Sequence, residues 1–250
     1  MKEVLKKNFD YIIVIPARLK SSRLPNKVLK KINKKNLIEI VWDLCKRAVN
    51  KKKIFVSSSD KKIEKFCNSR RINFINSSKK CLTGTDRLVE VSRKINSQFY
   101  INVQADEILL DPNSILKVIK EIKKKKYDVV NCFKKIKNSE EYKSSSVPKI
   151  VLNKQKELIY ISRAGIPATK NFKFKGANKQ VCVYGFSKYA LEIFGKNKKK
   201  TPLENFEDIE ILRFLEQNIK VKMLEVNGSE FCIDTPEDLR KAKKMKKNTF

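Results

Sequence analysis

The chain has 250 residues, of which 41% are apolar, so it is long and apolar enough to bury the core of one large domain or two small ones. It contains no histidine, which excludes Ser-His-Asp, Cys-His and histidine-metal chemistry. Lysine and arginine number 58 against 27 acidic residues, a formal net charge of +31 that is spread along the whole chain. We therefore interpret the charge as a solvated surface and expect no nucleic-acid partner, with nucleic-acid binding kept as an alternative.

The N-terminal segment places basic residues before an apolar run, which is the order of a signal peptide. However, the run at residues 11–15 is too short for that purpose, and Pro16 and Arg18 follow at once. No stretch approaches the ~20 apolar residues that a membrane span requires. We therefore expect a cytoplasmic protein with no membrane segment.

The six cysteines are widely separated and form no C-x-x-C pair. With no histidine beside them, they do not indicate a zinc site, and we expect reduced thiols that pack as small apolar side chains.

Along the first half of the chain, short apolar strands alternate with segments of helical period. Strands are predicted at 11–16, 54–58, 72–75, 99–103 and 128–132, and helices at 36–49, 61–67, 85–95 and 114–122. This alternation predicts an α/β fold with a mostly parallel sheet and helices on both faces. Ligands bind beyond the carboxyl ends of such strands, where three polar segments fall: 17–27, 83–87 and 104–107.

The second half changes character. A hairpin is predicted from 149–152 and 158–161, followed by strands at 180–186 and 221–226 and by helices at 202–216 and 238–247. No linker rich in Gly, Pro or Ser divides the two halves, so we predict a single domain over residues 1–250.

The loop after the first strand is basic. It carries Arg18, Lys20, Arg23 and Lys27 directly after the apolar residues of that strand. Guanidinium groups and lysines at a strand end suit the oxygens of a triphosphate. The loop lacks the glycine pattern of a P-loop or of a dinucleotide-binding fold, so its basic composition alone is weak support.

Carboxylates follow two other apolar segments. Asp106 and Glu107 end the strand at 99–103, and Asp234 follows the apolar residues 231–233. A hard cation held between carboxylates and substrate phosphates would explain them. The alternatives are an ordinary acidic turn and, near Asp234, a helix start capped by Thr235.

Motifs in this order along nearly the whole chain resemble the CMP-Kdo synthetases, the 3-deoxy-manno-octulosonate cytidylyltransferases. They are Ile15-Pro16-Ala17-Arg18, Ser22-Arg23-Leu24-Pro25 with Lys27, Ser59-Asp60, Thr83-Gly84-Thr85-Asp86-Arg87, Asn102-Val103-Gln104-Ala105-Asp106-Glu107, Ser162-Arg163-Ala164, Tyr184-Gly185, Pro202-Leu203-Glu204, Glu210 and Asp234-Thr235-Pro236-Glu237-Asp238-Leu239. The related acylneuraminate cytidylyltransferases usually end the first loop differently, so its Arg-Leu-Pro-x-Lys form favours the Kdo branch.

The resemblance implies a nucleotide-diphosphosugar transferase (Rossmann-like) fold and a homodimer. It implies that the anomeric hydroxyl of a 3-deoxy-2-ulosonic acid attacks the α-phosphorus of CTP and releases pyrophosphate, with Mg²⁺ as cofactor. The resemblance implies that the triphosphate is held by Arg18, Arg23 and Lys27 and that the metal is bound by Asp106 and Asp234. It places Thr83, Gly84 and Arg87 near the nucleoside. It implies that the sugar site is lined by Gln104, Arg163, Gln180, Tyr184 and Glu210, where Arg163 pairs with the sugar carboxylate.

The chain departs from the family at four positions: Cys81, Ala105, Ala168 and Gln180. The family usually has histidine at the first and last of these, glycine at the second and tryptophan at the third. Because the phosphate and metal positions persist, we expect CTP chemistry to be retained. The acceptor is Kdo or a Kdo-like sugar, and the alternatives are a different nonulosonic acid such as an acylneuraminate-type sugar, a nucleotidyltransferase with another nucleotide, or an inactive homologue.

Overall fold

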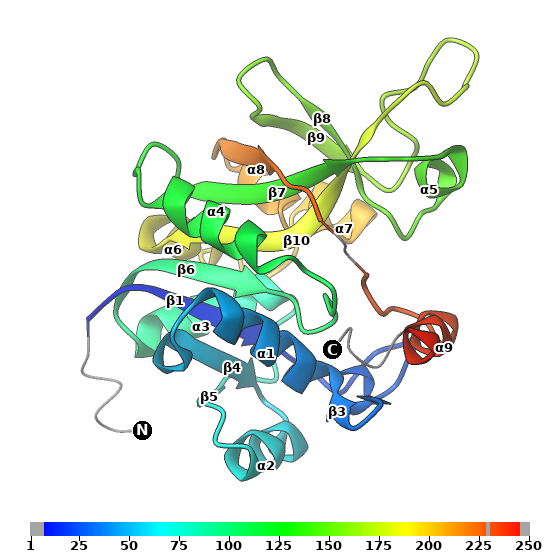
Figure 1. Cartoon of the computed structure of the whole chain (residues 1–250). Helices are drawn as coiled ribbons and strands as arrows, with labels where there is room; N and C mark the ends of the chain where they lie inside the picture. The colour runs from blue at the N-terminus through cyan, green and yellow to red at the C-terminus, as the bar shows by residue number, and fades with distance from the viewer. Residues whose placement is uncertain (1–7, 229–230, 246–250) are drawn as a thin grey trace.

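The protein was examined as a computed structural model, which describes residues 8–228 and 231–245. One nine-stranded sheet runs through the molecule, with the main order β11-β7-β10-β6-β1-β4-β5 and with β8 and β9 added beyond β10 (Figure 1). The strands are β1 (Phe9–Pro16), β4 (Ile54–Ser58), β5 (Phe74–Asn76), β6 (Ser97–Val103), β7 (Val129–Lys135), β8 (Lys149–Leu152), β9 (Leu158–Ser162), β10 (Asn178–Ser187) and β11 (Val221–Glu225). A two-stranded ribbon, β2 (Lys31–Ile32) and β3 (Lys35–Asn36), stands apart from this sheet.

Helices cover both faces of the sheet, as the strand-helix alternation predicts. On one face, apolar side chains of α1 (Leu37–Ala48), α2 (Lys61–Ser69), α4 (Pro112–Ile122) and α9 (Pro236–Lys244) join the core. On the other face the core includes α3 (Gly84–Lys94), α6 (Lys188–Phe194) and α8 (Leu212–Glu216). Shorter helices are α5 (Ser139–Lys143) and α7 (Pro202–Glu207), with 3-10 turns at Lys27–Leu29 and Lys51–Lys53.

The sheet is mostly parallel within its first half. β1 pairs in parallel with β4 and β6, β4 with β5, and β7 with β11. Strand β10 runs antiparallel to both β6 and β7 and separates the two parallel sets. The carboxyl ends of β1, β4 and β6 therefore meet at one edge, which brings the polar segments after them together.

The prediction of one helix over 202–216 is wrong. Helix α7 ends at Asp208, whose φ of 50° and ψ of 45° are left-handed, and α8 begins only at Leu212. The apolar spacing misleads because Ile209 and Leu212 both face the core across the break. In the irregular segment between the two helices, Glu210 lines the cavity of the candidate active site.

The terminal helix begins at Pro236, two residues before the predicted start, behind the cap residue Thr235. Positions 246 and 247 of the predicted helix lie outside the described residues. Short elements with little periodic signal, among them α5, α6 and the β2-β3 ribbon, were not predicted.

Candidate active site

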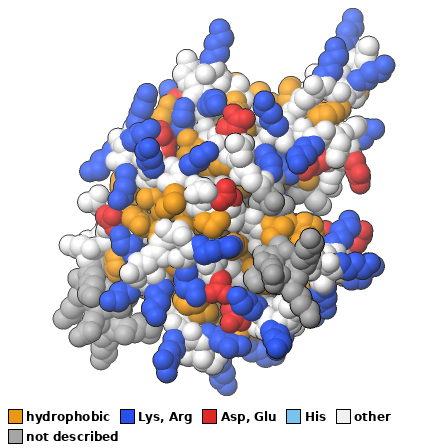
Figure 2. Space-filling model, viewed as in Figure 1, with side chains coloured by type: hydrophobic (Ala, Val, Ile, Leu, Met, Phe, Trp, Pro, Cys, Tyr) orange, Lys and Arg blue, Asp and Glu red, His pale blue; other side chains and the backbone are white. Residues whose placement is uncertain are grey.

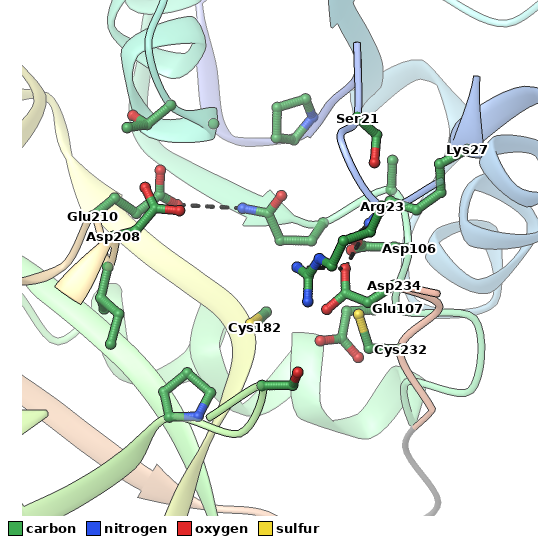
Figure 3. Close-up of a pocket in the computed structure, with 18 of the residues that line it drawn as sticks. Ser21, Arg23, Lys27, Asp106, Glu107, Cys182, Asp208, Glu210, Cys232 and Asp234 are labelled. Atoms are coloured by element: carbon green, nitrogen blue, oxygen red, sulfur yellow. Dashed lines mark hydrogen bonds and ion pairs between the residues drawn. The ribbon is translucent and has the colours of Figure 1, made fainter. Parts of the chain in front are cut away.

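A cavity of about 800 Å³ opens at the carboxyl ends of β1 and β6, beside the start of α3 (Figure 3). Every residue that the sequence assigned to the site lines this cavity: Arg18, Arg23, Lys27, Thr83, Gly84, Arg87, Gln104, Asp106, Arg163, Gln180, Tyr184, Glu210 and Asp234. The structure therefore brings the residues together, while the role of each remains a prediction.

The basic loop is fixed by its main chain. The amide of Ala17 donates to the Ser57 carbonyl at 2.9 Å, and the amide of Leu19 donates to the Asp60 carboxylate at 2.9 Å. The loop closes on itself through the Asn26 amide and the Leu19 carbonyl at 3.0 Å. Asp60 thus acts as a loop anchor, and the guanidinium groups of Arg18 and Arg23 are left exposed at the cavity.

Lys27 lies between two carboxylates at the floor of the cavity. Its Nζ donates to Asp106 Oδ2 at 2.5 Å and to Asp234 Oδ1 at 2.9 Å, although the three residues come from distant parts of the chain. Burial alone lowers the pKa of Lys27, but the negative charges of Asp106 and Asp234 outweigh it and raise that pKa above its ordinary value. Arg23 adds a second positive charge, with Nη2 3.4 Å from Asp234 Oδ1.

The carboxylate pair fits a divalent cation. Two oxygens from different segments converge on one position, and the Lys27 ammonium already neutralises charge there. Carboxylates with substrate phosphates are the ordinary ligands of Mg²⁺. Asp106 and Asp234 are thus the residues that would hold it, and Cys232 offers a third ligand atom, since the three atoms lie within 4.8 Å of one another.

The start of α3 forms a second wall. Thr83 caps the helix and exchanges hydrogen bonds with Asp86 in a capping box, which fixes the orientation of the first backbone amides of α3. A Cβ added at Gly84 would lie 2.9 Å from Gln104 Nε2 and 3.2 Å from Pro16 Cγ. A larger residue at this position would therefore displace the Gln104 side chain from its place beside the helix start.

Glu210 connects the start of α3 to Gln104, the residue that follows β6. Its carboxylate accepts from the Thr85 amide at 2.9 Å and from Gln104 Nε2 at 3.3 Å, the contact drawn in Figure 3. Burial raises the pKa of Glu210, and hydrogen bonds from Thr85 and Thr83 offset part of that rise. A polar side chain beside two amide donors suits recognition of hydroxyl groups.

Arg87 has a structural partner. Its buried guanidinium donates to Ser77 Oγ at 2.7 Å and to the Ser78 carbonyl at 3.4 Å. It therefore stabilises the segment that leads into α3 as well as lining the cavity.

Strand β10 supplies a third wall through a bulge. Its register with β7 shifts between Val181 and Tyr184. Asn131 of β7 stabilises the bulge, because its Nδ2 donates to the carbonyls of Val181 at 2.9 Å and Val183 at 2.8 Å. Asn131 also accepts from Gln180 Nε2 at 3.0 Å and so orients that side chain.

Arg163 lines the cavity, but its guanidinium is engaged by main-chain carbonyls. It donates to Glu207 at 2.6 Å, Ser145 at 2.9 Å and Asp208 at 3.1 Å. Two of its five N–H groups remain for a ligand, so the pairing with a sugar carboxylate stays a prediction. Lys149 does not line the cavity, because its ammonium is buried and donates to the carbonyls of Ser144 and Arg163.

Three cysteines line the cavity, Cys81, Cys182 and Cys232, and none of them was predicted as a site residue. Cys182 lies in the β10 bulge, and Cys232 lies two residues before Asp234. Cys232 could have been noticed from that spacing, whereas Cys182 depends on a bulge that carries no sequence signal.

Residues 12–224 match the family model described as Cytidylyltransferase. The 3-deoxy-manno-octulosonate cytidylyltransferase of Elusimicrobium minutum is 34% identical over 244 residues, covering 96% of this chain and 99% of that protein. The enzyme of the same name from Rickettsia canadensis is 35% identical over 247 residues, covering 97% of this chain and 98% of that protein.

A solved CMP:2-keto-3-deoxy-manno-octonic acid synthetase in complex with CTP superposes with a TM-score of 0.85 at 28% identity, covering 94% of this chain and 97% of that one. A Bacillus anthracis structure described as a glucose-1-phosphate thymidylyltransferase shares the fold at 14% identity and a TM-score of 0.65, with coverage of 95% and 94%. The fold and the cavity define a nucleotidyltransferase, and the chain belongs to the cytidylyltransferase family. None of the helices within residues 8–228 and 231–245 is long and apolar enough to cross a membrane.

Proposed function

We propose that this protein transfers CMP from CTP to the anomeric hydroxyl of 3-deoxy-manno-octulosonate and releases pyrophosphate. The observation that carries the proposal is the cluster of Lys27, Asp106 and Asp234 below the exposed guanidinium groups of Arg18 and Arg23. This arrangement pairs cationic groups for a triphosphate with carboxylates for a cation. Relatives that align over almost the whole chain carry the name of that activity.

In the proposed reaction, the chain's own residues bind and orient. Arg18 and Arg23 contact the phosphates through charge-assisted hydrogen bonds. Lys27 leaves its carboxylate partners and turns its ammonium toward the phosphate oxygens. Mg²⁺, held by Asp106 and Asp234, would supply Lewis-acid stabilisation of the charge on the α-phosphoryl group and the leaving pyrophosphate.

The sugar side is the wall formed by Gln104, Gln180, Tyr184, Glu210 and Arg163. We place the hydroxyl groups of the sugar against the amides and Glu210, and its carboxylate against the free N–H groups of Arg163. The anomeric oxygen then forms a bond to the α-phosphorus, the bond to the bridging oxygen breaks, and the hydroxyl proton passes to solvent. Orientation of two anions in line supplies much of the rate gain.

The test is removal of one carboxylate at a time. Asp106→Asn and Asp234→Asn should each lower pyrophosphate release by at least ~100-fold, because each removes a ligand of the stabilising cation. Glu237→Gln, a change of an exposed acid on α9, is the matched control and should keep its activity. Near-normal turnover of either aspartate variant, with unchanged unfolding by urea, would remove that residue from the site.

We also propose a homodimer of this single-domain chain. Phe172 and Phe206 are 81% and 86% exposed, and Ile159 is 56% exposed on β9. Exposed apolar side chains indicate an interface where they form a contiguous patch, and the proposed dimer covers these three. Light scattering should give twice the chain mass at tens of micromolar protein, and Phe206→Ser should weaken the association. A monomer at that concentration would contradict this assembly.

For the compartment, we propose the cytoplasm. All six cysteines are free, although three of them line the cavity. Free thiols in this number fit a reducing environment.

A further inference from the structure

Beside the two metal-binding carboxylates lies a sulfur atom that the reaction does not need. Cys232 Sγ and one oxygen each of Asp106 and Asp234 lie within 4.8 Å of one another. Figure 3 shows Cys232 next to Asp234 and Glu107, on the side of the cavity where Lys27 and Asp106 lie. Cys182 approaches from the opposite strand and is a separate thiol.

The main chain fixes this group of atoms. Glu107 and Cys232 form an isolated antiparallel bridge. On its two sides, the Ile108 amide donates to the Phe231 carbonyl at 3.1 Å and the Ile233 amide donates to the Asp106 carbonyl at 3.2 Å. Because Cys and Asp side chains are short, this ladder sets the positions of the sulfur and of the Asp106 carboxylate, and the Asp234 amide is held by Asp238 Oδ2 at 3.1 Å. The arrangement is therefore preorganised rather than a meeting of long flexible side chains.

A positive charge already occupies the centre of the group. Lys27 Nζ donates to Asp106 at 2.5 Å and to Asp234 at 2.9 Å, and its side chain is only 14% exposed. The ammonium therefore marks a position where the protein stabilises a cation. Cys232 does not belong to the apolar core as Cys45, Cys67 and Cys132 do, since those three are fully buried and Cys232 faces the cavity.

We propose that Cys232 completes a three-ligand site with Asp106 and Asp234 that takes a thiophilic divalent cation such as Zn²⁺ or Co²⁺, a binding mode beyond that of Mg²⁺. The inference rests on the metal position of the proposed function. Mg²⁺ prefers oxygen and gains nothing from sulfur, whereas Zn²⁺ and Co²⁺ bind cysteine sulfur strongly. The thiol proton leaves to solvent as the bond to the metal forms. Such an ion would bind without CTP and would compete with Mg²⁺ for the carboxylates.

The test is a titration of the purified full chain with Co²⁺ in the absence of nucleotide. A near-ultraviolet sulfur-to-cobalt charge-transfer band should appear and saturate. It should be lost in Cys232→Ser and kept in Cys182→Ser and Cys81→Ser, the matched variants of the two other cavity thiols. No band in the wild-type protein, or a band that persists in Cys232→Ser, would overturn the proposal.

A competition assay makes the comparison quantitative. The ratio of Zn²⁺ affinity to Mn²⁺ affinity should fall on the order of tenfold or more in Cys232→Ser, because only the thiophilic ion uses the sulfur. Equal losses for both ions would show that Cys232 merely shapes the site, and would overturn the proposal. Lys27→Met should raise the affinity for Co²⁺ by removing the competing ammonium, and a fall in affinity would contradict the shared position.

These measurements separate the two hypotheses. The cobalt band reports ligation by Cys232 whether or not the protein turns over CTP. Pyrophosphate release with Mg²⁺ reports the proposed function. A band without turnover would sink only the proposed function, and turnover without a band would sink only the thiophilic site.

Discussion

At the scale of single residues, Glu210 links the chemistry of the cavity to stability. Its carboxylate is partly buried beside the Thr85 amide and Gln104, and burial raises its pKa above the ordinary value of 4.5. The native state therefore holds this proton at pH values where the unfolded chain has released it. Stability from this group is present below about pH 4.5 and is lost as pH rises through the native pKa.

We expect Glu210→Gln to remove that pH dependence. From pH 4.5 upward, the free energy of unfolding of the wild-type protein should fall relative to that of the variant. Urea unfolding of both proteins across this range measures the difference. A difference that is constant with pH would contradict the raised pKa.

Some of the contacts in the cavity could be predicted from the sequence, and others could not. The basic loop follows β1 and Asp106 follows β6, so their meeting at one sheet edge was predictable, as was the place of Asp234 after the apolar residues 231–233. The engagement of Arg163 by three carbonyls was not, because those carbonyls belong to a loop and to the irregular turn after α7. The spacing of Cys232 two residues before Asp234 was visible in the sequence, but its closeness to Asp106 follows from the bridge with Glu107.

At the scale of elements, the bulge of β10 depends on one side chain of β7. Asn131 is fully buried and donates to the carbonyls of Val181 and Val183 at the bulge. Asn131→Asp replaces this donor by an acceptor, and should cost about 1–3 kcal/mol for each carbonyl left unpaired. It should also lower kcat/KM, because the bulge that carries Cys182 loses the two hydrogen bonds from Nδ2, although Asp keeps the acceptor for Gln180.

Urea unfolding and steady-state kinetics measure these two effects. Asn68→Asp on α2, which is exposed, is the matched control. If Asn131→Asp unfolded like that control, the bulge would not depend on this side chain.

A buried network of charged side chains joins helices α3, α7 and α8. Arg213 and Glu204 are both fully buried and share two hydrogen bonds of 2.7 and 2.8 Å, while Asp86 at the start of α3 accepts from Arg213 at 3.2 Å. Removing one partner leaves an uncompensated buried charge. Glu204 belongs to a motif shared with the family, and in this structure it positions helices rather than touching the cavity.

Arg213→Met should therefore destabilise the protein by about 3–5 kcal/mol, and the double variant with Glu204→Gln should be less destabilised than the single variant. Lys241→Met on the surface of α9, the control, should leave the urea midpoint of unfolding unchanged. Urea unfolding of the wild type, Arg213→Met, Glu204→Gln and the double variant gives the coupling energy. Additive losses would show that the pair does not act as a unit.

The helices themselves were predictable to different degrees. The long amphipathic segments gave α1, α3 and α4 nearly as expected, because their apolar spacing is set by core contacts on one face. The break at Asp208 was not predictable from that spacing, since the apolar residues on both sides of it remain in the core. Local backbone geometry decided the outcome where the hydrophobic pattern was compatible with either structure.

At the scale of the whole molecule, the sheet order explains the site. The parallel strands β1, β4 and β6 end at one edge, and antiparallel β10 closes the cavity from the other half. The parallel part follows from strand-helix alternation, but no local pattern shows that β10 inserts between β6 and β7. The positive side chains are distributed over the face seen in Figure 2 instead of forming one stripe, which fits a solvated surface with positive charge available near anionic substrates.

The most direct test of the account is pyrophosphate release by the purified protein with CTP, Mg²⁺ and a panel of 2-ulosonic acids, with UTP as the control nucleotide. The account predicts release with CTP and 3-deoxy-manno-octulosonate that exceeds release with any other sugar of the panel, and little release with UTP. Equal release with UTP, or a clear preference for an acylneuraminate-type sugar, would contradict it. So would failure of the folded protein to bind CTP.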